Sequence, residues 1–417
     1  MPKNIVLCLD GTWNGLEITA TKQPSNVWHL FDSLAGEEAP RKMELGRVAE
    51  VEKKCDGQVA KYIHGIGDEP TPLQYIEGAI GGGIINRIAH GYSYIAGQYE
   101  KGDKIYICGF SRGATEARAI ADLIASMGLL KRTDDETEDS FWWRCELLFD
   151  KSLRKLPGNE KKSYPVRFLQ DFRFPQRVNQ DPESFKNASP KSKAILESYQ
   201  FQETPETLDS DVEVEAVAVW DTVEALTPLE RAENNTLNIL TDECHQKIRN
   251  GFHAISVDEN RTAFSPSLWN CRKEGVIQCL FPGAHSDVGG GYPSDESGLS
   301  NNALHWMLSR LPGELFKDLN EVKSKFKGDS VAMSHLSDSF ILSRDLRDFS
   351  KRQGDLRVHQ SILDRWDTEV TVKLDSGDKT PAQPYRPKQL ASHVLAGKPL
   401  PGVEVEPYGL SEEALLA

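Results

Sequence analysis

A serine flanked by glycines is the residue in this sequence best suited to nucleophilic chemistry. It lies in the segment Gly109-Phe110-Ser111-Arg112-Gly113, which fits the pattern GxSxG. A buried apolar run typical of a strand comes before it, and a helix pattern follows it. Two glycines let a strand turn sharply into a helix and leave the serine hydroxyl exposed. The pattern predicts a nucleophile elbow at Ser111; the alternative is a Gly-rich turn whose serine only caps the helix.

A serine nucleophile needs a base to take its proton and an acid to orient that base. In α/β hydrolases the acid and then the histidine follow the serine along the chain. Asp221 comes directly after the apolar run 212–220, and His285 comes shortly after the run 275–281. We therefore predict Asp221 as the acid and His285 as the base.

Other residues compete for these two roles. Asp221 is also compatible with a helix cap or a turn, and His285 with an ordinary hydrogen-bonded loop histidine. His359 is the competing base and His253 a remoter one, although neither follows so clear a strand. Asp287 is the competing acid, but its place before three glycines suits it better to ordering that loop.

Acyl transfer also needs hydrogen-bond donors aimed at the developing oxyanion. The backbone N–H of Arg112, directly after the nucleophile, is the first expected donor. The second should come from an early strand-to-helix loop, and Asp10-Gly11-Thr12 occupies that position. We expect the N–H of Gly11 or Thr12 to serve, with Asp10 in support; the alternative is an ordinary tight turn.

Two other chemistries are compatible with parts of the sequence. Leu9-Asp10-Gly11-Thr12 resembles the opening motif of haloacid-dehalogenase-like phosphatases, but Cys8 stands where that family has its nucleophilic aspartate. Oxygen ligands from Asp10, Asp221 and Asp287 with the His285 imidazole could together hold a divalent cation. Neither a metal nor a cofactor is required by the serine mechanism, and we expect none.

Strand-like and helix-like segments alternate along the chain. Continuous apolar runs predict buried strands, and apolar residues at helical spacing predict helices. The predicted strands are 4–9, 59–63, 104–109, 212–220 and 275–281, and the predicted helices are 84–99, 114–130 and 302–311. This alternation predicts an α/β fold of the α/β-hydrolase type, with a mostly parallel, doubly wound sheet. Since functional groups gather at the carboxyl ends of such strands, Asp10, Ser111, Asp221 and His285 should meet at one edge.

The domain organisation expected is one catalytic domain over 1–370 and a C-terminal wrapping tail over 371–417. Residues 131–210 are rich in charge and proline and lack the strand–helix alternation, so we expect a helical or irregular insertion there. Its aromatic start, Phe141-Trp142-Trp143, is either part of a lid that presents apolar surface to lipid or a buried helix face.

The composition limits the partners of the chain. Its 417 residues carry 49 Lys+Arg and 63 Asp+Glu, a net charge of −14 that repels nucleic acid. No apolar run approaches the ~18 residues of a transmembrane segment. The seven cysteines contain no CxxC pair, so neither a disulfide scaffold nor a structural zinc site is expected. The N-terminus lacks a signal-peptide pattern, which predicts a protein that is cytoplasmic as synthesised.

Three further motifs accompany the GxSxG segment. They are Leu9-Asp10-Gly11-Thr12-Trp13-Asn14, Val219-Trp220-Asp221-Thr222-Val223 and His285-Ser286-Asp287-Val288-Gly289-Gly290-Gly291-Tyr292. In this order, the four motifs together resemble the α/β-hydrolase family of type VI secretion phospholipase effectors, first catalogued as a bacterial domain of unknown function. The resemblance runs from residue 4 to about residue 366, and it is more specific than GxSxG alone.

The resemblance implies Ser111 as nucleophile, Asp221 as orienting acid and His285 as base, in a hydrolase of phospholipid acyl esters. It also implies delivery into a rival bacterium by the type VI secretion machine, with a secretion spike protein and an immunity protein as partners. Two alternatives stay open. One is a soluble carboxylesterase or polyester depolymerase, and the other is a non-catalytic binding scaffold of the same fold.

Overall fold

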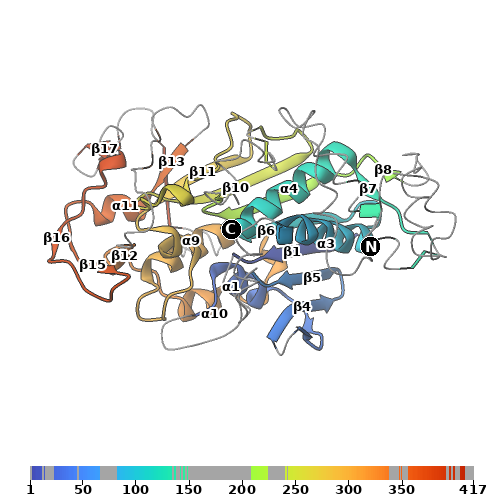
Figure 1. Ribbon diagram of the computed structural model, residues 1–417, viewed down its shortest axis with the longest axis horizontal. Coiled ribbons are helices and arrows are strands. Elements are labelled where there is room, and N and C mark those ends of the chain that lie inside the picture. The colour runs from blue at the N-terminus through green and yellow to red at the C-terminus, as the bar shows by residue number, and fades with distance from the viewer. Residues whose placement is uncertain are drawn as a thin grey trace.

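Within the described residues, the chain forms a central sheet of eleven strands with helices packed on both faces, and the apolar runs of the sequence supply its middle strands (Figure 1). The computed structural model describes residues 2–11, 14, 23–44, 47–65, 82–133, 136–137, 141, 144–145, 148, 208–223, 240–241, 243–337, 347, 349, 356–390, 394–395, 398–399 and 404–408. The α/β class expected from the sequence is confirmed.

Parallel strands make up most of this sheet. In spatial order they are β19 (Val405–Glu406), β13 (Leu356–His359), β11 (Val276–Phe281), β10 (Ile248–Ser256), β9 (Val214–Trp220), β6 (Lys104–Phe110), β1 (Asn4–Leu9) and β5 (Gln58–Ile63). Every neighbouring pair in this series is parallel. The carboxyl ends of these strands therefore lie along one edge, as the catalytic arrangement predicted from the sequence requires.

An antiparallel extension continues the sheet beyond β5. It consists of β2 (Glu37–Glu38), β3 (Lys42–Glu44) and β4 (Arg47–Cys55). None of the strands predicted from apolar runs falls here, because these segments carry many charged residues. Ion pairs across the strands supply part of the pairing: Lys61 Nζ of β5 lies 2.9 Å from Glu50 Oε2 and 3.1 Å from Glu52 Oε1 of β4.

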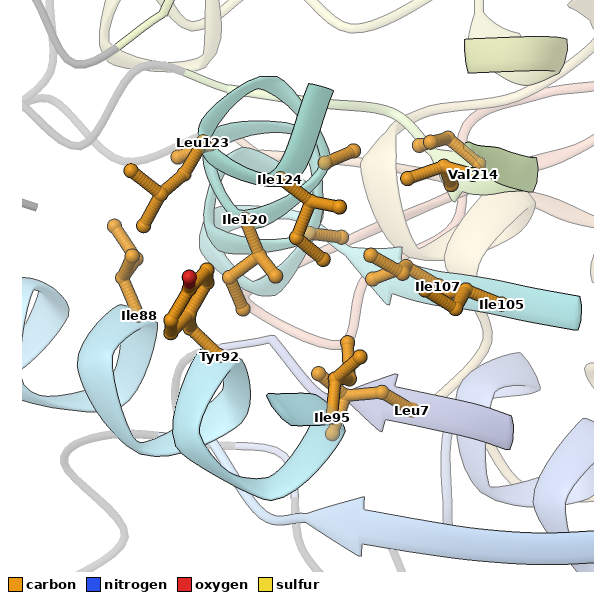
Figure 2. Packing of buried hydrophobic residues seen from close by; sticks show 14 of the residues in the cluster. Leu7, Ile88, Tyr92, Ile95, Ile105, Ile107, Ile120, Leu123, Ile124 and Val214 are labelled. Atoms are coloured by element: carbon orange, nitrogen blue, oxygen red, sulfur yellow. The ribbon is translucent and has the colours of Figure 1, made fainter. Parts of the chain in front are cut away.

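The two faces of the sheet are covered by separate pairs of helices. They are α3 (Gly82–Gln98) and α4 (Arg112–Met127) on one face, and α1 (Asn26–Ser33) and α9 (Gly298–Ser309) on the other. Alternate residues of β1 face opposite ways, so Leu7 joins the α3/α4 core while Val6 and Cys8 join the α1/α9 core. Figure 2 shows Leu7 among the aliphatic side chains of α3 and α4. Each such buried side chain contributes about 1.5–3 kcal/mol.

The C-terminal part of the chain surrounds one end of the sheet. Its remaining elements are α10 (Leu319–Lys325), β12 (Ser334–Leu336), α11 (Gln360–Arg365), β14 (Glu369–Val370), β15 (Val372–Leu374), β16 (Gln383–Pro384), β17 (Val394–Leu395) and β18 (Lys398–Pro399). The expected tail also supplies β19, an edge strand of the main sheet. There Glu406 is buried and accepts hydrogen bonds from Trp306 Nε1 at 3.0 Å and Arg357 at 2.6 Å.

The described part of the expected insertion is small. Its ends pair as β7 (Leu129–Leu130) and β8 (Leu208–Asp209). Phe141, Cys145 and Leu148 are buried against the α3/α4 core, which fits the buried helix face rather than an open apolar surface. Trp142, Trp143 and residues 149–207, which hold most of the expected lid, lie outside the described residues.

A disulfide joins Cys244 to Cys271, a single pairing that the cysteine spacing of the sequence does not predict. Cys244 lies just before β10 and Cys271 just before β11. Because these strands are parallel neighbours, their amino ends meet and bring the two thiols together across 27 residues. That proximity arises from strand order, which cysteine spacing does not contain.

Candidate active site

The turn between β6 and α4 holds Ser111 in a backbone conformation that few residues adopt. Its φ is 57° and its ψ −124°, in a region that costs about 1–3 kcal/mol for a residue with a side chain. Two glycines make this turn sterically possible. A Cβ on Gly109 would lie 2.4 Å from the carbonyl oxygen of Gly113, and one on Gly113 would lie 2.2 Å from that of Leu9. This strand–turn–helix geometry is compatible with the nucleophile elbow predicted from the sequence.

Asp221 emerges beside the elbow because β9 is the neighbour of β6. Phe110 pairs with Trp220, so Ser111 and Asp221 are the next residues of adjacent strands. The Ser111 amide donates to the Trp220 carbonyl at 3.1 Å. Asp221 itself has a φ of 38°, in the left-handed region that few residues with a side chain adopt.

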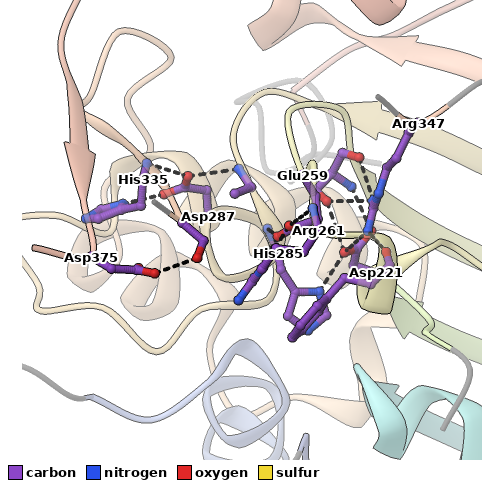
Figure 3. Close-up of polar contacts among 12 residues, drawn as sticks. Asp221, Glu259, Arg261, His285, Asp287, His335, Arg347 and Asp375 are labelled. Atoms are coloured by element: carbon purple, nitrogen blue, oxygen red, sulfur yellow. Dashed lines mark hydrogen bonds and ion pairs between the residues drawn. The ribbon is translucent and has the colours of Figure 1, made fainter. Parts of the chain in front are cut away.

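His285 is the first residue of the short helix α8 (His285–Gly289), which follows β11. Its Nδ1 lies 2.6 Å from Asp221 Oδ2 (Figure 3). Phe110 packs against the imidazole with ring centroids 4.6 Å apart, and Phe264 meets it edge-on at 4.8 Å. These contacts hold the ring with Nδ1 toward the acid, so that Nε2 is the atom left for proton transfer.

The serine hydroxyl and the second imidazole nitrogen both remain available. Within the described ranges, neither Ser111 Oγ nor His285 Nε2 makes a hydrogen bond. Ser111 is 6% exposed and His285 5%, so both lie in a nearly closed site. Catalytic hydrogen bonds are often loose in an empty site and shorten when substrate binds.

Arg347 pairs with Asp221, a contact that sequence reasoning missed. Its guanidinium donates to Asp221 Oδ1 at 2.6 Å and to Oδ2 at 3.0 Å, and Figure 3 shows it on the side of the carboxylate away from His285. Burial alone would raise the pKa of the Asp221 carboxyl, but Arg347 and the His285 hydrogen bond hold it well below its ordinary value. Asp221 is therefore ionised. Arg347 lies in a charged stretch that resembles a solvated surface segment, so the sequence carries no signal for this contact.

A second ion pair, between Glu259 and Arg261, lies next to the backbone of His285. Glu259 Oε2 accepts the backbone N–H of His285 at 3.2 Å, while Arg261 donates to both Glu259 oxygens at 2.8 and 2.7 Å. Burial lowers the pKa of His285 below its ordinary value, more than the Asp221 and Glu259 carboxylates raise it. The imidazole is thus neutral near pH 7, the form a general base requires.

The backbone N–H groups expected to bind the oxyanion belong to Arg112 and to Gly11 or Thr12. Arg112 is the first residue of α4, so its backbone N–H lies at the amino end of that helix, next to Ser111. The Gly11 N–H donates to Asp10 Oδ1 at 2.7 Å, and the Gly11 carbonyl accepts from Asn14 N at 2.9 Å, which turns the chain at Gly11. Thr12 lies outside the described residues.

Asp10 is buried beneath that turn. It accepts hydrogen bonds from Ser25 Oγ at 2.7 Å and Tyr62 Oη at 2.6 Å, besides the Gly11 amide. A Cβ on Gly11 would lie 3.0 Å from Ser111 Cβ, so the turn borders the serine. Asp10 shapes one wall of the site.

Asp287 contacts His335, whereas Asp221 contacts His285. Asp287 Oδ1 lies 2.7 Å from His335 Nδ1, and Oδ2 accepts the amides of Ala284 and His335 at 2.9 and 2.8 Å (Figure 3). Although burial lowers it, the pKa of His335 is raised overall by the Asp287 and Glu296 carboxylates. Asp287 thus orders the loop after β11.

The two competing bases are buried away from Ser111. His359 ends β13, a strand not evident from the sequence, with β11, β10 and β9 between it and β6. Its Nδ1 bonds to Ser361 Oγ at 2.7 Å at the start of α11. His253 lies inside β10, also not predicted, and its Nε2 accepts the Thr222 amide at 3.0 Å. Burial lowers the pKa of each to about 3.

The suggested metal ligands do not form a cluster. Across the residues that the structure describes, no group of three or more His, Cys, Asp or Glu side chains is arranged to hold a metal ion. The Asp221 carboxylate already accepts hydrogen bonds from His285, Arg347 and Ser256. In the same part of the chain, no helix combines the length and apolarity needed to cross a membrane.

Most of the parallel core matches one described protein family. Over residues 3–310 the chain matches "T6SS, Phospholipase effector Tle1-like, catalytic domain". The uncharacterized protein YEL023C of Saccharomyces cerevisiae is 28% identical over 155 residues, 34% of this chain and 20% of that protein.

Two solved structures are also similar. One is an uncharacterized protein from Pseudomonas aeruginosa, with a TM-score of 0.44 and 17% identity over 79% of this chain and 49% of that one. The other is the Tle1 effector bound to the VgrG spike of the type 6 secretion system, with a TM-score of 0.34 and 19% identity over 72% of this chain and 52% of that one. The chain spans about half or less of each of these three relatives.

Proposed function

Because the chain belongs to the family of Tle1-like phospholipase effectors of the type VI secretion system, we propose that it is a serine hydrolase of phospholipid acyl esters. The observation that carries this proposal is the 2.6 Å contact between His285 Nδ1 and Asp221 Oδ2, next to a serine at a strained elbow. In a catalytic triad, the imidazole takes the proton of the serine hydroxyl, and the carboxylate orients the imidazole and stabilises its positive charge.

The reaction proceeds in two halves. Ser111 Oγ bonds to the acyl carbonyl carbon as its proton moves to His285 Nε2, and Asp221 stabilises the imidazolium. The Arg112 N–H donates to the oxyanion. The bond to the leaving alcohol breaks as His285 returns the proton to that oxygen. Water then attacks the acyl-enzyme, and His285 takes its proton and passes it to Ser111 as the acid leaves.

The family supports the proposed substrate class and the proposed delivery route. Phospholipids are the substrate class that the family description names, so their acyl esters are the proposed scissile bonds. We also propose delivery by a type VI secretion system, a spike protein as the carrier and an immunity protein that protects the producing cell. The net charge of −14 gives no general attraction to anionic lipid headgroups.

Two assays test the chemistry and then the substrate. A fluorophosphonate probe should label the wild type and the control Ser126→Ala, which alters a serine at the far end of α4, but not Ser111→Ala. Absence of labelling in all three folded proteins would favour a binding scaffold. Phospholipid vesicles compared with short p-nitrophenyl esters then separate the two esterase classes. Turnover of the short esters alone would contradict the phospholipid assignment.

A further inference from the structure

One guanidinium joins several parts of the candidate site. Besides both oxygens of Asp221, Arg347 donates to the Ser256 carbonyl and hydroxyl, each at 2.7 Å, and to the carbonyl of Phe264. Ser256 in turn donates to Asp221 through its amide and its hydroxyl, both at 3.0 Å. Arg347 is 7% exposed, so these bonds form in an environment where charge is poorly screened.

On this geometry we propose that Arg347 is a positioning residue, which fixes the orientation of Asp221 and limits the negative charge that Asp221 presents to His285. The proposal rests on the proposed triad, since it assigns a role to a neighbour of its acid. Arg347 lies behind the carboxylate and acts only through Asp221 and the neighbouring loop.

The orienting part of this role follows from the fork of the guanidinium. A bidentate pair holds a carboxylate in one plane, whereas a single hydrogen bond lets it rotate. Because Arg347 and the Ser256 hydroxyl also donate to Asp221 Oδ2, that oxygen has one direction left for His285 Nδ1. A fixed acceptor fixes the imidazole tautomer that the reaction needs.

The same guanidinium holds the wall against which His285 packs. The short helix η3 (Thr262–Phe264) ends at the carbonyl that Arg347 binds, and the Phe264 ring meets the imidazole edge-on. The guanidinium carbon of Arg261 lies over the Phe264 ring, 3.7 Å from its centroid. Loss of Arg347 therefore loosens both the acid and one contact of the base.

The charge part follows from the groups around His285. Asp221 and Glu259 present negative charge to the imidazole, while Arg347 and Arg261 offset it. Asp287, on the helix of His285, is paired with His335 instead. Removing the Arg347 charge leaves Asp221 uncompensated, which stabilises the imidazolium. We expect the pKa of His285 to rise by about one unit or more.

The test combines kinetics with a direct titration of the imidazole. Arg347→Gln removes the charge, and Arg347→Lys keeps the charge without the fork. The matched control is Arg365→Gln, since Arg365 is also buried but donates to the carbonyls of Ser330 and Ala332 rather than to a carboxylate. The three variants and wild type are compared for kcat and KM against pH on p-nitrophenyl butyrate. The His285 pKa is measured by NMR on protein with ¹³C-labelled histidine.

The expected result separates the two parts of the role. Arg347→Gln should lower kcat by about tenfold or more with little change in KM, and shift the acidic limb and the NMR pKa upward. Arg347→Lys should return the His285 pKa to its wild-type value but should not restore the full kcat. Arg365→Gln should change the stability and leave kcat and the His285 pKa unchanged. An unchanged His285 pKa in folded Arg347→Gln overturns the proposal. Because the NMR titration needs no turnover, a chain that never hydrolyses esters refutes the proposed function without obscuring this result.

Discussion

Replacing Asp221 by asparagine is the most direct test of the site, because it removes a charge with almost no change in shape. Asparagine tolerates a left-handed backbone, so the φ of 38° at this position adds no strain. The surroundings are less tolerant. Five hydrogen bonds reach the carboxylate, from His285 Nδ1, two nitrogens of Arg347 and the amide and hydroxyl of Ser256.

The magnitude follows from those partners. If the new amide group faces His285, Nδ1 must accept rather than donate, and Nε2 then carries a proton and cannot take one from serine. This tautomer costs about 10⁴-fold in kcat in a serine triad, or about 5.4 kcal/mol of transition-state stabilisation. Loss of the carboxylate also leaves Arg347 buried without its counter-charge, which should destabilise the fold by about 3 kcal/mol.

Ester hydrolysis and denaturant unfolding of the same preparation measure the two effects. The control is Asp258→Asn, since Asp258 is a partly buried carboxylate that accepts from Gly283 N and Tyr385 Oη and does not contact His285. It should keep kcat within about threefold of wild type. Folded Asp221→Asn with kcat within about tenfold of wild type would refute the assignment of Asp221 as the acid.

Three further outcomes test the fold around the site. Gly113→Ala places a Cβ 2.2 Å from a β1 carbonyl and should cost about 3 kcal/mol of stability together with activity; an unchanged unfolding midpoint would contradict the elbow geometry. His253 and His359 each have a pKa of about 3 in the folded chain. Below the ordinary histidine pKa, these two side chains therefore bind protons in the unfolded chain and not in the folded one. These two histidines should therefore lower the stability as the pH falls below about 6.5, by up to about 1.4 kcal/mol per pH unit each, whereas the raised pKa values of Asp122 and Asp258 act in the opposite direction. The unfolding free energy of His359→Gln should thus fall less than that of wild type between about pH 7 and pH 5, and equal slopes would refute this. Replacing Cys244 and Cys271 by serine should lower the free energy of unfolding by about 3.5 kcal/mol, and equal stability of the oxidised wild type and the double variant would contradict it.

Matched controls exist for two of these changes. Gly313→Ala adds a Cβ where nothing lies within 4 Å, so it should leave stability and activity nearly unchanged. Cys55→Ser removes a partly exposed free cysteine and should not reproduce the loss expected from the Cys244 and Cys271 pair.

The sequence alone determined those parts of the site that depend on short-range pattern. The elbow is local, because two glycines around a serine between a strand and a helix permit only one kind of turn. Asp221 and His285 could be placed at the same edge because parallel strands share the direction of their carboxyl ends. Continuous apolar runs were enough to predict β1, β6, β9 and β11, which are buried on both faces.

Tertiary structure decided everything that depends on which segments become neighbours. Arg347 reaches Asp221 across 126 residues, Cys244 meets Cys271 because β10 and β11 begin side by side, and residues 405–406 complete the sheet from the far end of the chain. Neither the residue type nor the position in the sequence distinguishes these residues from solvent-exposed residues of the same kind. Their roles arise from burial beside a particular partner, since a charge or a thiol acquires its chemistry from what surrounds it, and only the folded chain provides those surroundings.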